Sequence, residues 1–357
     1  MKTLKIKLLS DHTLTMEEID CELVDEVDYF VTQEASGNLK INVDLQPELT
    51  ISAIEDFVNA VAFPHDLSKH SSANISDYYP LINYFLNKFK PNYFYSPKVE
   101  LFFEAMKSCH GSNIFYEFIP DRFYQKNSNQ NVVVFRGLIE TMKAIALSKP
   151  FQQKLKKWNA NFKKSYSSAE KYVQSLFEKY SRLLVVRLDL GFRNTENAID
   201  EGVSIEDAKK LLSRFLNAKR SNKIFDDVVG YIWKLEYGEL KGYHYHLLIF
   251  LDGSRARKDI SRGMLMGEYW LNLTQGNGVF YVSNFNKHCF EKLGLLGIGM
   301  ISHSESDKIR NLHKILKYFF KTDQYLREKP SKRSRMYGKG ETVQMNSLGR
   351  GRPRAKI

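Results

Sequence analysis

The sequence predicts an α+β protein in which helices pack on an antiparallel sheet. From residue 183 onward, short apolar runs typical of strands alternate with amphipathic helical segments. Two of these runs are joined by a tight, glycine-bounded turn, as in an antiparallel hairpin. The preceding residues, 96–180, have mainly helical patterns. Together these observations predict a mainly helical region followed by a domain built on an antiparallel sheet.

The N-terminal region, residues 1–95, is acidic and its role is undetermined. Strand-like runs occur at 28–32 and 39–45, separated by Ser36-Gly37-Asn38. An aromatic stretch punctuated by prolines follows at 77–97. Its rings could stack on unpaired bases, but a cluster of this kind more often forms part of a core, which is the interpretation we favour.

The second region, residues 96–180, is predicted to be mainly helical and basic. Ser96 and Pro97 form an N-cap and first-turn pair that opens a helix through Met106, and helices are expected over 131–148 and 150–180. The last of these is rich in lysine, which indicates either a phosphate-facing surface or a solvated one. These lysines are Lys154, Lys156, Lys157, Lys163, Lys164 and Lys171.

The third region, residues 181–330, contains the expected sheet. Strands are predicted at 183–190, 228–237, 243–251 and 279–284, and helices at 204–220, 258–273 and around Tyr318. Asp207 completes a capping box at the start of the first helix. This order is typical of an RRM-like sandwich, in which the 243–251 strand lies centrally and the last helix crosses the same face.

A candidate metal site lies in the hairpin Trp233-Lys-Leu-Glu-Tyr-Gly-Glu-Leu-Lys-Gly-Tyr-His-Tyr-His246. Side chains at i and i+2 of a strand share a face, so His244 and His246 project together. If the hairpin is symmetric about Leu240, Glu236 lies opposite His244 on that face. Two imidazoles and a carboxylate could hold Mg²⁺, Mn²⁺ or Zn²⁺ with positions left open for a phosphate oxygen. A histidine pair alone is more often structural; the aligned glutamate favours the metal hypothesis.

A candidate nucleophile lies on the helix around 308–325. Apolar residues recur there at helical spacing, and Tyr318 and Lys321 share one face with Lys314 one turn before. A phenol is a weak nucleophile at neutral pH, and a nearby ammonium favours its phenolate. The simpler alternative is an amphipathic helix whose tyrosine only packs.

The order of these motifs resembles that of the HUH endonuclease superfamily of rolling-circle replication initiators. More narrowly, Tyr180 to Leu190, the Glu236 to Gly253 hairpin and Tyr318-Phe-Phe-Lys-Thr-Asp-Gln324 resemble the inovirus replication-protein family, whose members also occur in prophages. The resemblance covers roughly residues 97–330. Tyr245 departs from the aliphatic residue usual in that family, although its side chain faces the opposite side of the sheet.

This resemblance implies that residues 181–330 form an HUH endonuclease domain, a metal-dependent DNA nickase and joining enzyme. Glu236, His244 and His246 would bind the divalent cation, Mg²⁺ or Mn²⁺, and Tyr318 would be the nucleophile, assisted by Lys321. Arg187 and Lys314 are predicted to contact DNA. The implied substrate is single-stranded or extruded origin DNA, and the freed 3′-hydroxyl would prime a host polymerase.

The charge distribution is uneven and favours nucleic-acid binding in the part that carries the motifs. Residues 1–100 carry 8 Lys+Arg against 16 Asp+Glu, a net of −8, whereas the remainder carries 45 against 25, a net of +20. Residues 331–357 contain eight basic residues and one acidic residue, so this tail is expected to be disordered and to contact duplex DNA. Arg350 and Arg352 resemble the core of an AT-hook-like element, although a generic basic tail is the simpler interpretation.

Several absences narrow the function. The three cysteines are far apart, and no Cys-x-x-Cys pair occurs, so no zinc ribbon or disulfide framework is expected. No signal peptide or long apolar run is present, which predicts a cytoplasmic protein without membrane contact. No P-loop motif occurs, so unwinding would need a separate host helicase.

The function predicted from these observations is rolling-circle replication initiation by cleavage and joining of origin DNA through a 5′-phosphotyrosyl intermediate. Two alternatives remain open. A relaxase or transposase would use the same chemistry on another substrate. A non-catalytic origin-binding repressor would bind DNA but need neither metal nor Tyr318.

Overall fold

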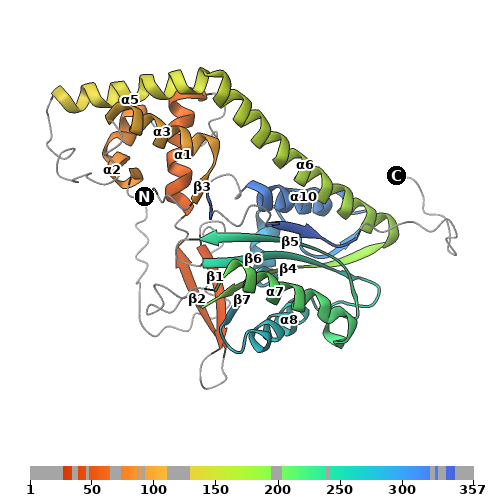
Figure 1. Cartoon of the computed structure of the whole chain (residues 1–357). Coiled ribbons are helices and arrows are strands. Elements are labelled where there is room, and N and C mark those ends of the chain that lie inside the picture. Colours follow the sequence, from red (N-terminus) through yellow and green to blue (C-terminus); the bar gives the residue numbers. More distant parts are fainter. Residues whose placement is uncertain are drawn as a thin grey trace.

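The computed structural model describes residues 27–33, 39–45, 48–64, 74–86, 89, 93–110, 129–193, 203–238, 242–321, 326–328 and 335–341. These residues form an α+β structure with an antiparallel sheet, helices on both of its faces, and a separate helical region (Figure 1). The predicted fold class is therefore confirmed. None of the helices in these residues is long and apolar enough to cross a membrane.

The helical region is built around an aromatic core. Phe57, Phe85 and Phe102 are fully or almost fully buried and contact one another through their rings. The Ser96 hydroxyl accepts a hydrogen bond from the backbone NH of Val99 at 3.1 Å, which confirms the predicted N-cap. The elements are α1 (Glu48–Ala62), η3 (Ile75–Leu81), α2 (Ile82–Leu86), α3 (Pro97–His110) and α5 (Asn129–Leu147). Most of the aromatic stretch near residue 80 thus belongs to a core.

A single long helix, α6 (Lys149–Lys179), leads from the helical region to the sheet (Figure 1). Ser148 caps its start, and Pro150 occupies the first turn, where a missing backbone NH is harmless. Its last third packs on the sheet through Tyr172, Val173 and Leu176. The segment between its two packed ends is largely exposed and carries most of the predicted lysines.

The main sheet has eight strands in the order β10-β5-β6-β4-β7-β1-β2, with β8 also paired to β4. Every pairing is antiparallel. The strands are β1 (Val27–Gln33), β2 (Leu39–Leu45), β4 (Arg182–Phe192), β5 (Val228–Gly238), β6 (Gly242–Asp252), β7 (Gly278–Val282), β8 (Gly299–Ser302) and β10 (Tyr337–Lys339). A separate pair joins β3 (Tyr93–Tyr95) to β9 (Leu326–Glu328).

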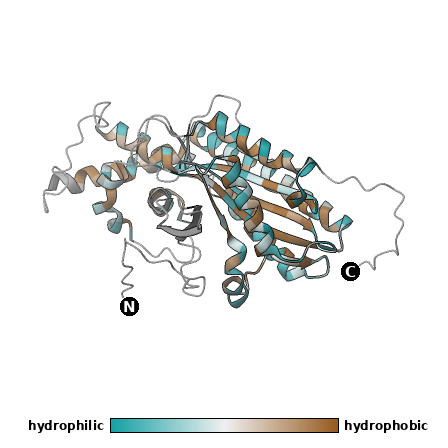
Figure 2. Cartoon of the chain, turned by 90° about the horizontal axis from the view of Figure 1, so that it is seen from below, coloured by the Kyte–Doolittle hydropathy of each residue, from teal (hydrophilic) through white to brown (hydrophobic). Residues whose placement is uncertain are grey.

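Two pairs of helices bury the two faces of this sheet. The helices α7 (Ile205–Asn217) and α8 (Asp259–Leu273) pack on one face, whereas α6 and α10 (Ser306–Lys321) pack on the other (Figure 1). The strands between these helices are largely hydrophobic (Figure 2). Gly267 of α8 lies so close to the sheet that a β-carbon there would be 2.1 Å from the Phe280 ring. The short elements η5 (Ala218–Arg220), η6 (Lys223–Phe225), η7 (Ser283–Asn286) and α9 (Lys287–Lys292) complete the connections.

The ends of the sheet differ from expectation. The two strand-like runs near the N-terminus are strands, and β1 extends the main sheet by pairing with β7. The prediction of a wholly disordered tail is wrong for β10, which pairs with β5. Met336 is buried and the Tyr337 ring lies 4.8 Å from that of Phe320, so two apolar side chains offset the cost of ordering a polar segment.

The strand predicted over 279–284 ends at Val282, because Asn284 turns inward toward β4. Its side-chain amide accepts a hydrogen bond from the Arg187 backbone NH and donates one to the Val185 carbonyl, both at 2.9 Å. The amide thereby replaces strand backbone in the gap along β4 between β7 and β8.

The cysteines also require a correction. Cys109 is a free thiol, whereas Cys289 is fully buried and disulfide-bonded, although the sequence indicated no disulfide framework.

Candidate metal centre

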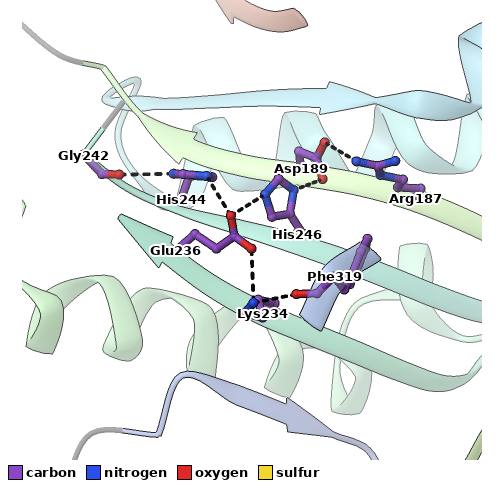
Figure 3. A network of polar contacts seen from close by, with 8 residues as sticks. All are labelled: Arg187, Asp189, Lys234, Glu236, Gly242, His244, His246 and Phe319. Atoms are coloured by element: carbon purple, nitrogen blue, oxygen red, sulfur yellow. Dashed lines mark hydrogen bonds and ion pairs between the residues drawn. The ribbon is translucent and has the colours of Figure 1, made fainter. Parts of the chain in front are cut away.

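The three predicted ligands converge at one end of the β5–β6 hairpin (Figure 3). The register pairs Glu236 with His244, as predicted, and places His246 opposite Lys234. The Glu236 Oε2 atom lies 3.8 Å from His244 Nε2 and 3.4 Å from His246 Nε2. One potential ligand atom from each residue therefore lies within 4.8 Å of the others.

Each histidine is oriented through its other ring nitrogen. His244 Nδ1 lies 3.1 Å from the Gly242 carbonyl oxygen, and His246 Nδ1 lies 2.8 Å from Asp189 Oδ1. Both partners are acceptors, so each Nδ1 carries the hydrogen. The Nε2 atoms that face Glu236 are then the positions for a metal, and this is the outer-shell arrangement typical of metal-binding histidines.

A buried lysine supports the carboxylate. Lys234 is fully buried, and its Nζ lies 3.3 Å from Glu236 Oε1. The same ammonium donates a hydrogen bond to the backbone carbonyl of Phe319 on α10 at 2.5 Å. The Phe319 ring is 5.7 Å from the His246 ring, so the C-terminal part of α10 lies against the site (Figure 3).

On the other side of His246, Asp189 is held by Arg187. The shortest distance between the guanidinium and the carboxylate is 3.9 Å, and the guanidinium lies 5.6 Å from the centre of the Phe319 ring. Arg187 and Asp189 are two residues apart on β4, so their side chains lie on the same face of the sheet, and this is the face that carries the histidines. The structure thus places Arg187 in the surroundings of the metal site, and its contact with DNA stays a prediction.

The charges of the site are strongly coupled. Burial raises the pKa of Glu236, but the charges of Lys234 and His246 outweigh it and hold that pKa well below its usual value. Burial lowers the pKa of His246, yet the carboxylates of Asp189 and Glu236 outweigh it and raise that pKa to about 9. Burial raises the pKa of Asp189, whereas the charges of His246 and Arg187 lower it overall. Without an ion, His246 is therefore protonated at neutral pH.

These residues fit a divalent cation. Two imidazole nitrogens and one carboxylate oxygen converge, and the Nδ1 contacts of both histidines leave their Nε2 atoms as the positions for a metal. Two carboxylates balance the charges of Lys234 and Arg187. A bound ion would have to displace the proton of His246, because the same atom cannot hold both.

The remaining predicted residues lie on α10 or outside the described part of the chain. Tyr318 is 42 % exposed on α10 and immediately precedes the buried Phe319. Lys314 is exposed on the same helix, and its Nζ lies 3.0 Å from Asn311 Oδ1. Lys321 is the last residue of α10, and its side chain is outside the described part of the chain, as are Arg350 and Arg352.

The sequence analysis gave no role to Asp189 and overlooked Lys234. Lys234 stands two residues before Glu236 on the same strand, so the alternation rule could have identified it. Asp189 is 57 residues from His246 and becomes its neighbour only through the β4–β6 register.

Comparison with known proteins gives one match. The family model described as the YagK/YfjJ C-terminal domain, typically found in prophage-like proteins, matches residues 149–264. This segment spans α6 to the first part of α8 and includes the three candidate ligands, but it ends before Tyr318. No curated protein matches the chain. No solved structure matches it either. The matched segment is thus similar to a domain of prophage-like proteins.

Proposed function

We propose that this protein is a metal-dependent DNA endonuclease and strand transferase that initiates rolling-circle replication through a tyrosyl intermediate. The observation that carries the proposal is the convergence of His244, His246 and Glu236 on one face, next to the helix that carries Tyr318. The anchored Nδ1 atoms favour metal binding over incidental packing of two histidines.

The chain's own residues would divide the work as follows. Glu236, His244 and His246 would hold Mg²⁺ or Mn²⁺, which when bound would polarise the scissile phosphate. The phenolic oxygen of Tyr318 would form a bond to phosphorus while the bond from phosphorus to the 3′-oxygen breaks. The 3′-hydroxyl leaves with a proton, and the 5′ end stays linked to the tyrosine. Lys321, at i+3 from Tyr318, would favour the phenolate.

The likeness to a domain of prophage-like proteins is compatible with a replication protein of a mobile element, and the substrate would be single-stranded or extruded origin DNA. Release of a 3′-hydroxyl would supply a primer for a host polymerase, with a host helicase unwinding ahead of it. The HUH and inovirus resemblance, described above from the motifs, supplies this biological setting.

The exposed part of α6 offers a surface for duplex DNA. No acidic residue occurs from Lys149 to Ala169, and the lysine pairs 156–157 and 163–164 are exposed. The two pairs are seven residues, or nearly two helical turns, apart, so they lie on one side of the helix about 10 Å from each other. Regularly spaced ammonium groups of this kind would neutralise phosphates along a backbone.

A nicking assay tests the central proposal. We expect a labelled single-stranded origin oligonucleotide to be cleaved with Mn²⁺ or Mg²⁺ and to become covalently attached to the protein, with no reaction in EDTA. Tyr318→Phe keeps the ring and loses only the oxygen, so this variant should bind DNA and metal but form no adduct. Tyr325→Phe, a nearby tyrosine without lysine at i+3, is the matched control and should form the adduct.

The assay also separates the alternatives. Peptide mapping of the DNA to Tyr325, or cleavage without any protein adduct, would refute the role of Tyr318. Full activity in EDTA would refute the metal site. A relaxase or transposase would form the adduct on a different sequence, whereas a repressor would bind origin duplex without cleavage.

A further inference from the structure

We infer that Lys234 is a positioning residue that couples the metal-binding carboxylate to the tyrosine helix; the catalytic part of this inference rests on the proposed function. Lys234 and Glu236 are two residues apart on β5, so both side chains project from the same face of the sheet. The Lys234 ammonium contacts Glu236 Oε1 at 3.3 Å and the Phe319 carbonyl oxygen at 2.5 Å. One buried cation therefore joins a candidate metal ligand to the residue next to the candidate nucleophile.

The hydrogen bond from Lys234 to Phe319 satisfies a carbonyl group near the C-terminal end of α10. The last carbonyl groups of a helix have no partner within the helix, and Phe319 is two residues from the end of α10 at Lys321. A cation near these carbonyls also interacts favourably with the helix dipole. Because Lys234 lies on a strand paired on both sides, opposite Tyr337 of β10 and His246 of β6, we infer that its hydrogen bond sets where the last turn of α10, including Tyr318, lies relative to β5.

Burial of the Lys234 ammonium group is energetically costly. A fully buried ammonium is costly unless it is paired and hydrogen-bonded, and Lys234 has both kinds of partner. An apolar residue at this strand position could fill the same volume without that cost. Moreover, a positive charge beside Glu236 does not strengthen cation binding. Geometry at the end of α10, rather than affinity for the metal, is the property that this lysine serves.

The kinetic test compares Lys234→Met, which keeps the unbranched side chain, with wild type under single-turnover conditions at saturating DNA and Mn²⁺. We expect the rate constant for adduct formation to fall by about ten-fold or more, because small displacements of a nucleophile are costly. The dissociation constant for DNA should change by less than about two-fold, because Lys234 is fully buried, and Mn²⁺ affinity should not fall, because the substitution removes a positive charge beside Glu236. Lys234→Arg, which retains the charge and donors, should recover part of the rate.

The matched control is Lys287→Met, which removes a lysine ion pair of similar length, 2.7 Å to Asp259, outside the metal site. It should leave the rate constant unchanged. An unaltered rate in Lys234→Met, or a loss confined to Mn²⁺ affinity, would overturn the positioning role.

A second measurement, hydrogen exchange, does not depend on activity. It also avoids the destabilisation that a buried Glu236 carboxylate without its lysine would cause. Glu236→Gln and the double variant Lys234→Met/Glu236→Gln differ only in the lysine, and neither contains a buried unpaired carboxylate at position 236. Hydrogen exchange at residues 316–321 should be faster in the double variant, whereas residues 306–312 should exchange equally in both. Equal exchange at 316–321 would refute the anchor. Faster exchange in a protein whose wild type forms no adduct would instead refute the proposed function alone.

Discussion

The two faces of the central strands are built differently, although they share one backbone. Toward α7 and α8, the side chains of β6 are apolar at every second position from Tyr243 to Leu251. Toward α6 and α10, Leu248 and Phe250 are apolar, but His246 and His244 continue the row. On β5 the change from apolar to polar falls opposite His246, at Lys234, and on β4 it comes one inward-facing position earlier, at Arg187 opposite Leu248.

This difference shows how the sheet can accommodate a polar site. On β4, buried Leu183 and Val185 precede Arg187 and Asp189, and on β5 the apolar face gives way to Lys234 and Glu236. Burial of these charges is unfavourable, whereas the uninterrupted apolar face contributes hydrophobic stabilisation along the full length of the strands. The candidate site thus lies on the face that is only partly apolar, opposite the face that is apolar along the whole of β6.

The largest expected effect comes from the polar face. His246→Ala removes a ligand that we expect to be worth several kcal/mol to the reaction, so adduct formation should fall about 10³-fold or more. The same substitution removes the hydrogen-bond partner of Asp189, and this should lower the free energy of unfolding by only about 1–3 kcal/mol. Quantified adduct formation and chemical denaturation measure the two effects. His303→Ala, outside the site, should leave both almost unchanged; equal loss in that variant would argue against the site.

The apolar face should show the opposite pattern. Trp270 is fully buried between sheet and helices, and its indole NH donates to the Gly191 carbonyl at 2.9 Å. Trp270→Ala should lower the free energy of unfolding by about 3–5 kcal/mol, because it removes a large buried ring and leaves a cavity. Trp270→Phe should cost less. Urea denaturation checks both, and Mn²⁺ binding by the fraction that stays folded should persist. Loss of metal affinity in folded protein would show that the faces are not independent.

The helices on the two faces of the sheet can also be compared by how much their exposed basic residues contribute to duplex DNA binding. Substitution of Lys156, Lys157, Lys163 and Lys164 by alanine should weaken duplex binding. The slope of log K against log salt should become shallower by about 0.9 for each phosphate that is no longer neutralised. Fluorescence anisotropy in EDTA measures this without cleavage. The control changes four exposed basic residues on the α7 side: Lys210, Arg214, Lys219 and Arg220. If the slope of log K against log salt were equal in the two variants, duplex binding would depend on the net charge of the protein and not on the α6 surface.

The smallest effect concerns the packing of α6 against α10. His313 Nδ1 lies 3.5 Å from Glu170 Oε1; burial lowers the pKa of His313, and Glu170 only partly opposes this. The unfolded chain therefore takes up the proton more readily, so this histidine's contribution is full above about pH 6.5 and is lost as pH falls through the folded pKa. His313→Gln should consequently lose less stability than wild type between pH 7.5 and pH 5 in urea titrations. If the variant lost more stability than wild type over this pH range, the pKa of His313 would be raised in the folded protein, contrary to the prediction.

Local features of this chain could be predicted because they depend on neighbouring residues. Alternation along β5 and β6, with a tight turn between them, is enough to place Glu236 opposite His244 and to put His246 on the same face. The cap at Ser96 and the amphipathic periodicity around Tyr318 likewise depend on a few adjacent positions. These patterns determined the candidate ligands and the general class of the fold.

Only the tertiary structure decided which distant residues complete the site. Asp189 reaches His246 across 57 residues, and Lys234 reaches the Phe319 carbonyl across 85, because β4 pairs with β6 and α10 packs on the same face. The joining of β1 and β10 to the sheet also depends on distant partners. Periodicity shows which face of an element is apolar, but the choice of its partner depends on packing across the whole chain. That choice surrounds the three candidate ligands with residues that orient them and balance their charge.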